Sequence, residues 1–169
     1  MMRDIAAIVA VLFASVFGAS ANVPPPVPVR VVDIQAKLFC ASTGEFSSDV
    51  IGEPPALIWN ASVVNPDDAS DRCTTDETLA LAVLEAPASQ FIEGVTVDFQ
   101  ARYRINFRTR LDTLVRYVSR LGITGHDGRY YVPLLLTKTG CAHVTLRAVV
   151  RGAASPSSRE EVVRFECGE

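Results

Sequence analysis

The segment Val95–Phe107, VTVDFQARYRINF, decides the fold class, because apolar and polar residues alternate along its whole length. Successive side chains of a β-strand point to opposite faces, so this pattern predicts a long strand with one buried face and one face in water. A clean alternation also favours antiparallel pairing, since strands of parallel sheets are usually buried on both faces. The apolar positions are Val95, Val97, Phe99, Ala101, Tyr103, Ile105 and Phe107, and the polar ones are Thr96, Asp98, Gln100, Arg102, Arg104 and Asn106.

Further strand signals lie on both sides of this segment, with turn residues between them. About eight short strands predict an all-β fold, an antiparallel β-sandwich of immunoglobulin-like architecture, with a barrel as the alternative. Membership of the immunoglobulin family does not follow, because the cysteine spacing and the tyrosine positions differ from that pattern. Besides the central segment, we expect strands at Val29–Phe39, Leu57–Val64, Thr78–Leu84, Cys141–Val150 and Glu160–Glu166, with a loop at Gly44–Pro55.

The segment Leu111–Leu121 has features of both a helix and a strand. Its apolar residues fit helical spacing, and Asp112 and Arg116 fit an i,i+4 pair. Its β-branched and aromatic residues favour a strand instead, and a turn at Gly125–Gly128 leads directly into Arg129–Val132. We therefore expect a strand that forms a hairpin with the segment after this turn.

The start of the chain predicts export. Residues 1–21 have the pattern of a secretory signal peptide: a basic start, the apolar run Ile5–Phe17 and a small-residue cleavage site at Ala19-Ser20-Ala21. The apolar run is too short for a bilayer, which needs roughly 20 residues. Residues 22–28 form a Pro-rich extended arm, and 29–169 are expected to be a single β-sandwich domain. The excess of arginine over lysine favours a bacterial source, so we expect a periplasmic or secreted protein whose mature chain has no membrane span.

Four cysteines, all after residue 21, predict a disulfide framework, because exported chains meet an oxidising compartment. Four cysteines allow three connectivities, of which we favour Cys40–Cys73 and Cys141–Cys167. Each of these bridges would close a loop of about 30 residues, which stabilises a fold by roughly 3–4 kcal/mol. The chain has no C-x-x-C pair and no zinc-module spacing, so a structural role is expected.

Charge is divided along the chain, although the net charge of −3 gives no overall case for a nucleic acid partner. Acidic residues dominate from Glu45 to Asp98, and basic residues dominate from Arg102 to Arg151. One interpretation pairs the two blocks across strands. The other is a basic strand face for phosphate, sulfate or carboxylate groups, since the arginine fork suits these anions. The candidate residues for this face are Arg102, Arg104, Arg108, Arg110, Arg116 and Arg120.

The sequence offers little catalytic chemistry, and we expect no enzyme, no metal and no cofactor. The two histidines, His126 and His143, lack metal-ligand spacing, and no nucleotide-binding or nucleophile-elbow motif is present. A Ser-His-Asp site assembles in space, so sequence alone does not exclude one. Acidic residues around Cys73 suggest a calcium site or, more simply, a solvated loop. These residues are Asp67, Asp68, Asp71, Asp76 and Glu77.

Together these features predict a non-catalytic binding or interaction module of the bacterial cell envelope, whose partner is a protein or an anionic polysaccharide. One alternative is an inhibitor of a secreted or periplasmic hydrolase that presents the turn Gly125–Tyr130 as a wedge. A second alternative is a structural subunit of a surface assembly, which pairs through the proline arm or an open edge strand.

Overall fold

The computed structural model describes residues 26–40, 43–52, 58–59, 62–64, 72–74, 77–103, 113–137 and 143–165. Throughout these residues the chain forms strands and turns without a helix, which confirms the predicted all-β class. Within the same residues, no helix long and apolar enough to cross a membrane is found. The predicted signal peptide, residues 1–21, and residues 22–25 of the predicted arm lie outside the described part of the chain.

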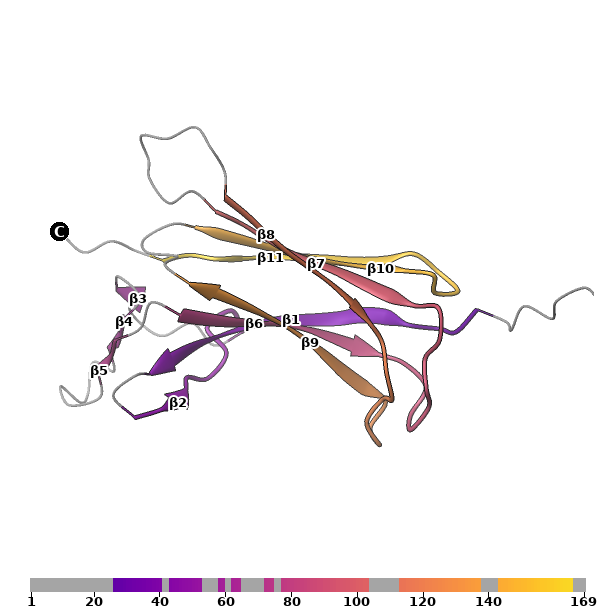
Figure 1. Ribbon diagram of the computed structural model, residues 1–169. Coiled ribbons are helices and arrows are strands. Elements are labelled where there is room, and N and C mark those ends of the chain that lie inside the picture. Colours follow the sequence, from indigo (N-terminus) through magenta and orange to yellow (C-terminus); the bar gives the residue numbers. More distant parts are fainter. Residues whose placement is uncertain are drawn as a thin grey trace, which may run out of the picture.

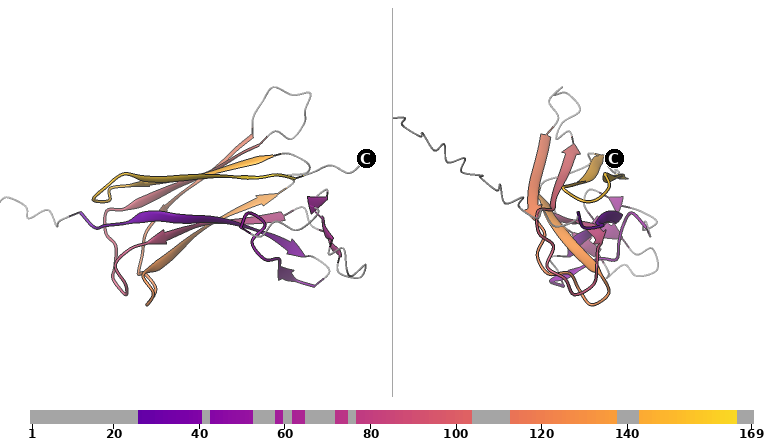
Figure 2. Two further views of the ribbon diagram at one scale, coloured as in Figure 1. Left: turned by 180° about the vertical axis from the view of Figure 1, so that it is seen from behind. Right: turned by 90° about the vertical axis from the view of Figure 1, so that its right-hand side faces the viewer.

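Two four-stranded antiparallel sheets lie one above the other and form the body of the molecule (Figure 1). The view along the long axis shows these two layers (Figure 2). This arrangement supports the predicted antiparallel sandwich. The first sheet has the order β2-β1-β6-β9, with bounds Glu45–Phe46, Arg30–Cys40, Glu77–Glu85 and Arg129–Thr137. The second has the order β11-β10-β7-β8, with bounds Ser157–Val163, Val144–Arg151, Thr96–Tyr103 and Thr113–Arg120.

Strand β7 lies inside the second sheet and has the predicted alternation. Val97, Phe99 and Ala101 are fully buried, and Tyr103 is nearly so. These side chains belong to one apolar cluster, whose burial stabilises the fold by roughly 25 cal/mol per Å² removed from water. The first sheet contributes alternate residues of β1, β6 and β9 to the same cluster: Ile34, Ala36, Leu38, Ala80, Ala82, Leu84, Val132, Leu134 and Leu136.

Strand β8 confirms the strand assignment within Leu111–Leu121, but the predicted hairpin with the next segment is wrong. β8 pairs with β7, whereas β9 pairs with β6 in the other sheet. A turn does form at Gly125–Gly128, where the Gly128 N–H donates to the Gly125 carbonyl. The residues before it cross from one sheet to the other, so the turn does not join two neighbouring strands.

The crossing segment is held by the β6–β7 connection, which runs beside it. The Thr124 N–H donates to the Gln90 carbonyl at 3.0 Å, and the Ile92 N–H donates to the Gly122 carbonyl at 3.1 Å. The buried Thr124 hydroxyl donates to the Pro87 carbonyl at 2.5 Å. These bonds satisfy backbone groups at the end of the sandwich and hold the chain where it changes sheets.

A small third sheet has the order β3-β4-β5, with bounds Ile58–Trp59, Ser62–Val64 and Arg72–Thr74. The prediction of one strand over Leu57–Val64 is wrong, because Ile58 pairs with Val63 in an antiparallel ladder. Strand-favouring residues on both sides of Asn60 hid this reversal in the sequence, although asparagine itself is a common turn residue.

Some predicted bounds differ from the observed ones, and one is tested only in part. β11 begins at Ser157, before the predicted start at Glu160. The predicted loop Gly44–Pro55 contains β2, whose Phe46 pairs with Phe39 of β1 with ring centroids 5.4 Å apart. The central strand is described to Tyr103, and the remainder of its predicted length lies outside the described residues.

The predicted disulfides stay predictions. Cys73 lies in β5, and β5 contacts β1, which ends at Cys40. No cysteine among the described residues is free. Cys141 and Cys167 lie outside the described residues, so the arrangement is compatible with the Cys40–Cys73 bridge and does not test the second one.

Candidate functional site

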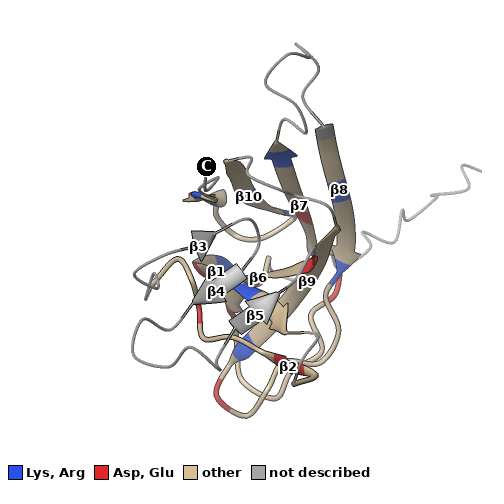
Figure 3. Cartoon of the chain, turned by 90° about the vertical axis from the view of Figure 1, so that its left-hand side faces the viewer, with Lys and Arg blue, Asp and Glu red and all other residues tan. Residues whose placement is uncertain are grey.

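The outer face of the second sheet carries five exposed arginines, called the arginine face below: Arg102, Arg116, Arg120, Arg147 and Arg151. They share a face because each alternates along its strand with residues that point toward the core, and because residues directly opposite each other on neighbouring strands point to the same side of a sheet. Figure 3 shows basic positions on both β7 and β8.

The register arranges most of the arginine face in two rows. Gln100 on β7 lies opposite Arg147 on one side and opposite Arg116 on the other. Thr96 lies in the same way between Arg151 and Arg120. Strand spacing places the arginines of one row about 10 Å apart, and the two rows lie about 13 Å apart along the strands. The face therefore presents cations on a flat surface of regular spacing.

Asp98 lies under the arginine face and corrects the expectation that it points into water. Its side chain is buried, with 1% of the residue exposed. Arg116 donates to it twice, from Nε to Oδ1 at 2.8 Å and from Nη2 to Oδ2 at 2.6 Å. Arg151 approaches the same carboxylate at 3.5 Å, and Gln100 donates to Oδ1 at 2.9 Å. The strand pattern correctly placed Asp98 on the outer face of the sheet. It did not show that the long side chains of Arg116 and Arg151 cover Asp98 there.

These donors keep Asp98 ionised although it is buried. The hydrogen bonds from Arg116 have the largest effect and hold the pKa of Asp98 at about 2, below its usual 3.8. Burial acts in the opposite direction, while Gln100 and Arg151 lower the pKa further. The pKa of Arg116 is raised by the same pair. Asp98 thus neutralises part of the arginine face and orients the Arg116 guanidinium.

The other three arginines have no such partner. No carboxylate among the described residues lies within ion-pair distance of Arg102, Arg120 or Arg147. Arg102 and Arg147 line a hollow of about 270 Å³ together with Gln100, Thr145 and Glu160. The lining thus has two guanidinium groups against one carboxylate, and guanidinium groups are suited to phosphate, sulfate or carboxylate groups of a partner.

The sequence predicted part of the arginine face. The structure brings Arg102, Arg116 and Arg120 to one face, whereas Arg104, Arg108 and Arg110 lie outside the described residues. Sequence reasoning missed Arg147 and Arg151 as members. The available signal was their position in β10, where they alternate with the apolar residues Leu146, Ala148 and Val150.

The competing interpretation, pairing of the acidic and basic blocks across strands, holds at one described position. Asp98 from the acidic block pairs with Arg116 and Arg151 from the basic block. Glu85 pairs instead with Arg30, which belongs to neither block. In the described chain, charge pairing therefore accounts for part of the arginine face and leaves three of its members unpaired.

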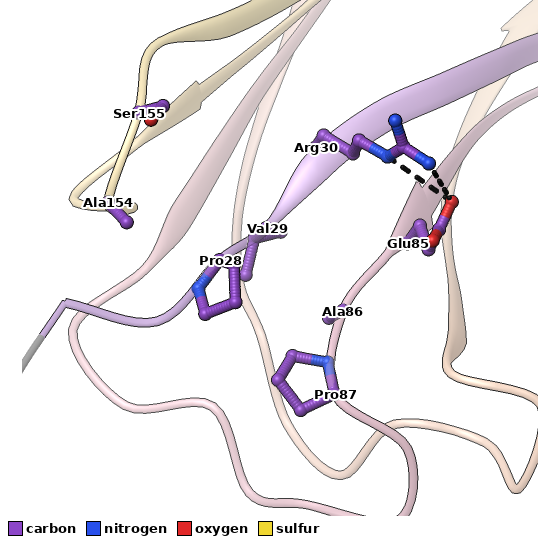
Figure 4. Close-up of a pocket in the computed structure, with 8 residues that line it drawn as sticks. All are labelled: Pro28, Val29, Arg30, Glu85, Ala86, Pro87, Ala154 and Ser155. Atoms are coloured by element: carbon purple, nitrogen blue, oxygen red, sulfur yellow. Dashed lines mark hydrogen bonds and ion pairs between the residues drawn. The ribbon is translucent and has the colours of Figure 1, made fainter.

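A separate pocket of about 440 Å³ lies at the end of the sandwich where β1 begins (Figure 4). Its wall is largely apolar, with Pro28, Val29 and Pro87 facing the opening from two segments. Its charged lining consists of Arg30 and Glu85, which are bonded to each other at 2.8 Å. These two charges are paired with each other and exposed to solvent.

The histidines and the acidic residues considered as metal ligands are described only in part. No group of three metal-ligating side chains occurs among the described residues. His126 Nδ1 lies 3.0 Å from the Ser89 hydroxyl in the exposed turn, and His143 is exposed before β10. Of the acidic residues considered for calcium, Glu77 begins β6, and the others lie outside the described residues: Asp67, Asp68, Asp71 and Asp76.

Comparison of the chain with protein-family models, with curated proteins and with solved structures finds no match.

Proposed function

We propose that the protein is an exported, non-catalytic binding module of the bacterial cell envelope, and that the arginine face binds an anionic partner. The partner is a protein or an anionic polysaccharide of the periplasm or of the medium. The export signal in residues 1–21 and the four later cysteines support this location. Two disulfides and an immunoglobulin-like arrangement of the sandwich are part of the same proposal.

One observation carries the proposal. The chain has a net charge of −3, yet the arginine face has five arginines beside two acidic residues, Asp98 and Glu160. Grouping five cations with only two counter-charges is unfavourable, and an anionic partner removes this cost. Asp98 lies beneath this face and fixes the Arg116 guanidinium in position. A side chain that is already fixed loses less conformational entropy when it binds a partner.

The test compares two triple variants with the same change of net charge. In the first, Arg102, Arg120 and Arg147 of the arginine face are each replaced by glutamine. In the control, Arg30, Lys37 and Arg129, which belong to β1 and β9 of the other main sheet, are each replaced by glutamine. The probes are polyglutamate and dextran sulfate, with binding measured by titration calorimetry at two salt concentrations.

We expect the wild-type protein and the control to bind at least one probe, with affinity that falls as salt rises. The arginine-face variant should bind at least about tenfold more weakly, since charge-assisted hydrogen bonds each contribute about 1.5–3 kcal/mol. Equal losses in both variants would reduce the effect to net charge and would contradict the proposal. A wild-type protein that binds neither probe would contradict it as well.

A further inference from the structure

Strand β8 is the one unprotected edge among the four edges of the two main sheets, as far as the described residues extend. β2, at one edge, is two residues long. β9 carries the exposed Pro133, which has no N–H to donate to a further strand. β11 is bonded across the sandwich to β1: the Val31 N–H donates to the Ser157 hydroxyl, and Arg159 donates to the Val32 carbonyl. Short strands, prolines and covered edges are how proteins block strand addition.

By contrast, β8 spans eight residues with no proline and with a continuous register against β7. Its unpaired side has a definite set of backbone groups. The Leu121 N–H donates to the Val95 carbonyl, and hydrogen-bonded pairs alternate along an antiparallel ladder. Odd-numbered residues of β8 therefore bond to β7, and even-numbered residues direct N–H and C=O groups to the open side. These residues are Leu114, Arg116, Val118 and Arg120.

The side chains of those four residues alternate between apolar and cationic on the outer face. Leu114 and Val118 are 50% and 52% exposed, so their side chains are accessible to a partner. Arg120 has no carboxylate partner among the described residues. Arg116 uses Nε and Nη2 for Asp98, which leaves its Nη1 for another acceptor. On the other face of the strand, Tyr117 is 47% exposed.

We propose that β8 binds an extended acidic segment of a protein partner as an added antiparallel strand. The inference rests on the proposed function and selects a protein over a polysaccharide. A row of backbone donors and acceptors matches another backbone, and exposed leucine and valine between arginines match alternating apolar and acidic side chains. Directly opposite Arg120, Val118, Arg116 and Leu114, the partner would present acidic, apolar, acidic and apolar residues.

The test uses the purified full-length chain and a labelled peptide with this pattern, in which Glu-Thr-Val-Thr is repeated. A second peptide has the same sequence with N-methyl groups on the Glu and Val amides that would face β8. A third has the same composition in scrambled order. Binding is followed by fluorescence anisotropy, and amide hydrogen exchange of β8 is followed by NMR. The protein variants are Val118→Pro, which removes an N–H on the open side, and Val118→Thr, which keeps it.

We expect the patterned peptide to bind the wild-type protein and Val118→Thr and to protect the amides of Arg116, Val118 and Arg120 from exchange. Val118→Pro and the N-methylated peptide should each weaken binding by about tenfold or more, the effect of losing one or two hydrogen bonds. Circular dichroism and binding of polyglutamate establish that Val118→Pro is folded. If that variant does not fold, binding of the N-methylated peptide to the wild-type protein still tests whether strand addition occurs.

Equal binding of the patterned, N-methylated and scrambled peptides would overturn strand addition while leaving an anion-binding arginine face. Binding of polyglutamate or dextran sulfate without binding of the patterned peptide would likewise overturn strand addition. Failure to bind the peptide and both polymers would overturn the proposed function together with this inference.

Discussion

Arg116 on β8 and Asp98 on β7 form a bidentate ion pair, although the two residues are diagonal neighbours rather than direct partners in the ladder. The direct partner of Arg116 is Gln100, which also donates to Asp98. The pair therefore joins two neighbouring rows of the sheet and ties the edge strand to the strand beside it. The Arg116–Asp98 pair thus stabilises the sheet and also holds one guanidinium of the arginine face in a fixed position.

The replacement Asp98→Asn tests the energetic role of this pair. The pKa of Asp98 is about 2 in the folded protein and near 3.8 in the unfolded chain, so the folded state gains stability above pH 4 and loses it as the pH falls toward 2. The difference in unfolding free energy between the wild type and Asp98→Asn should shrink by about 2 kcal/mol between pH 5 and pH 2. Urea denaturation over this range measures it, and a difference independent of pH would contradict the assignment.

The exposed pair Arg30–Glu85 provides the contrasting case, because Arg30 also donates from Nε and Nη2, but to one carboxylate oxygen and without burial. Both side chains are more than half exposed, at 67% and 51%. Water and salt screen such a pair, so Glu85→Gln should change the unfolding free energy by less than about 1 kcal/mol. The same denaturation experiment at low and high salt checks this. A loss as large as that of Asp98→Asn would mean that burial does not control the strength of these pairs.

Phe99 is the largest of the fully buried side chains contributed by β7. Phe99→Ala should destabilise the protein by about 3–5 kcal/mol, because it removes a buried ring and leaves a cavity between the sheets. The matched control is Phe91→Ala in the β6–β7 connection, where the ring is 67% exposed, and its effect should be below about 1 kcal/mol. Thermal denaturation of both variants separates core packing from loss of an aromatic residue in general.

Gly128 and Gly44 both have positive φ angles, 72° and 74°, but their surroundings differ. A Cβ at Gly128 would lie 2.6 Å from the Ala86 carbonyl oxygen, whereas a Cβ at Gly44 would meet nothing within 4 Å. Gly44→Ala should cost about 1 kcal/mol from backbone strain alone. Gly128→Ala should cost about 2 kcal/mol or more, because the turn must also move away from Ala86. Equal losses would show that the close approach is relieved without cost.

The sequence was sufficient for the fold class because the alternation along β7 is long and nearly perfect. It was not sufficient for the pairing of β8. A local pattern shows that a segment is a strand but does not show which strand lies beside it, and the turn after β8 resembled a hairpin turn. The crossing depends on bonds between Thr124, Gln90 and Pro87, which are distant in sequence and leave no periodic signal.

The same limit applies to the arginine face. Alternation placed Arg102 on the polar face of β7, and this required no knowledge of other strands. Arg147 and Arg151 join the face through the pairing of β10 with β7, which is a long-range contact. The burial of Asp98 depends on side chains from two neighbouring strands, so its low pKa could not be predicted from its own position.

The first and last strands, β1 and β11, lie side by side and run in the same direction, since Val31 meets Ser157 and Asp33 meets Arg159 (Figure 1). The start of β1 and the end of β11 therefore lie at opposite ends of the long axis. A tension applied between these two points would shear β1 along β6 and β11 along β10, so that all hydrogen bonds of each ladder share the load. The geometry therefore predicts that the sandwich resists stretching along its long axis more strongly than stretching across it.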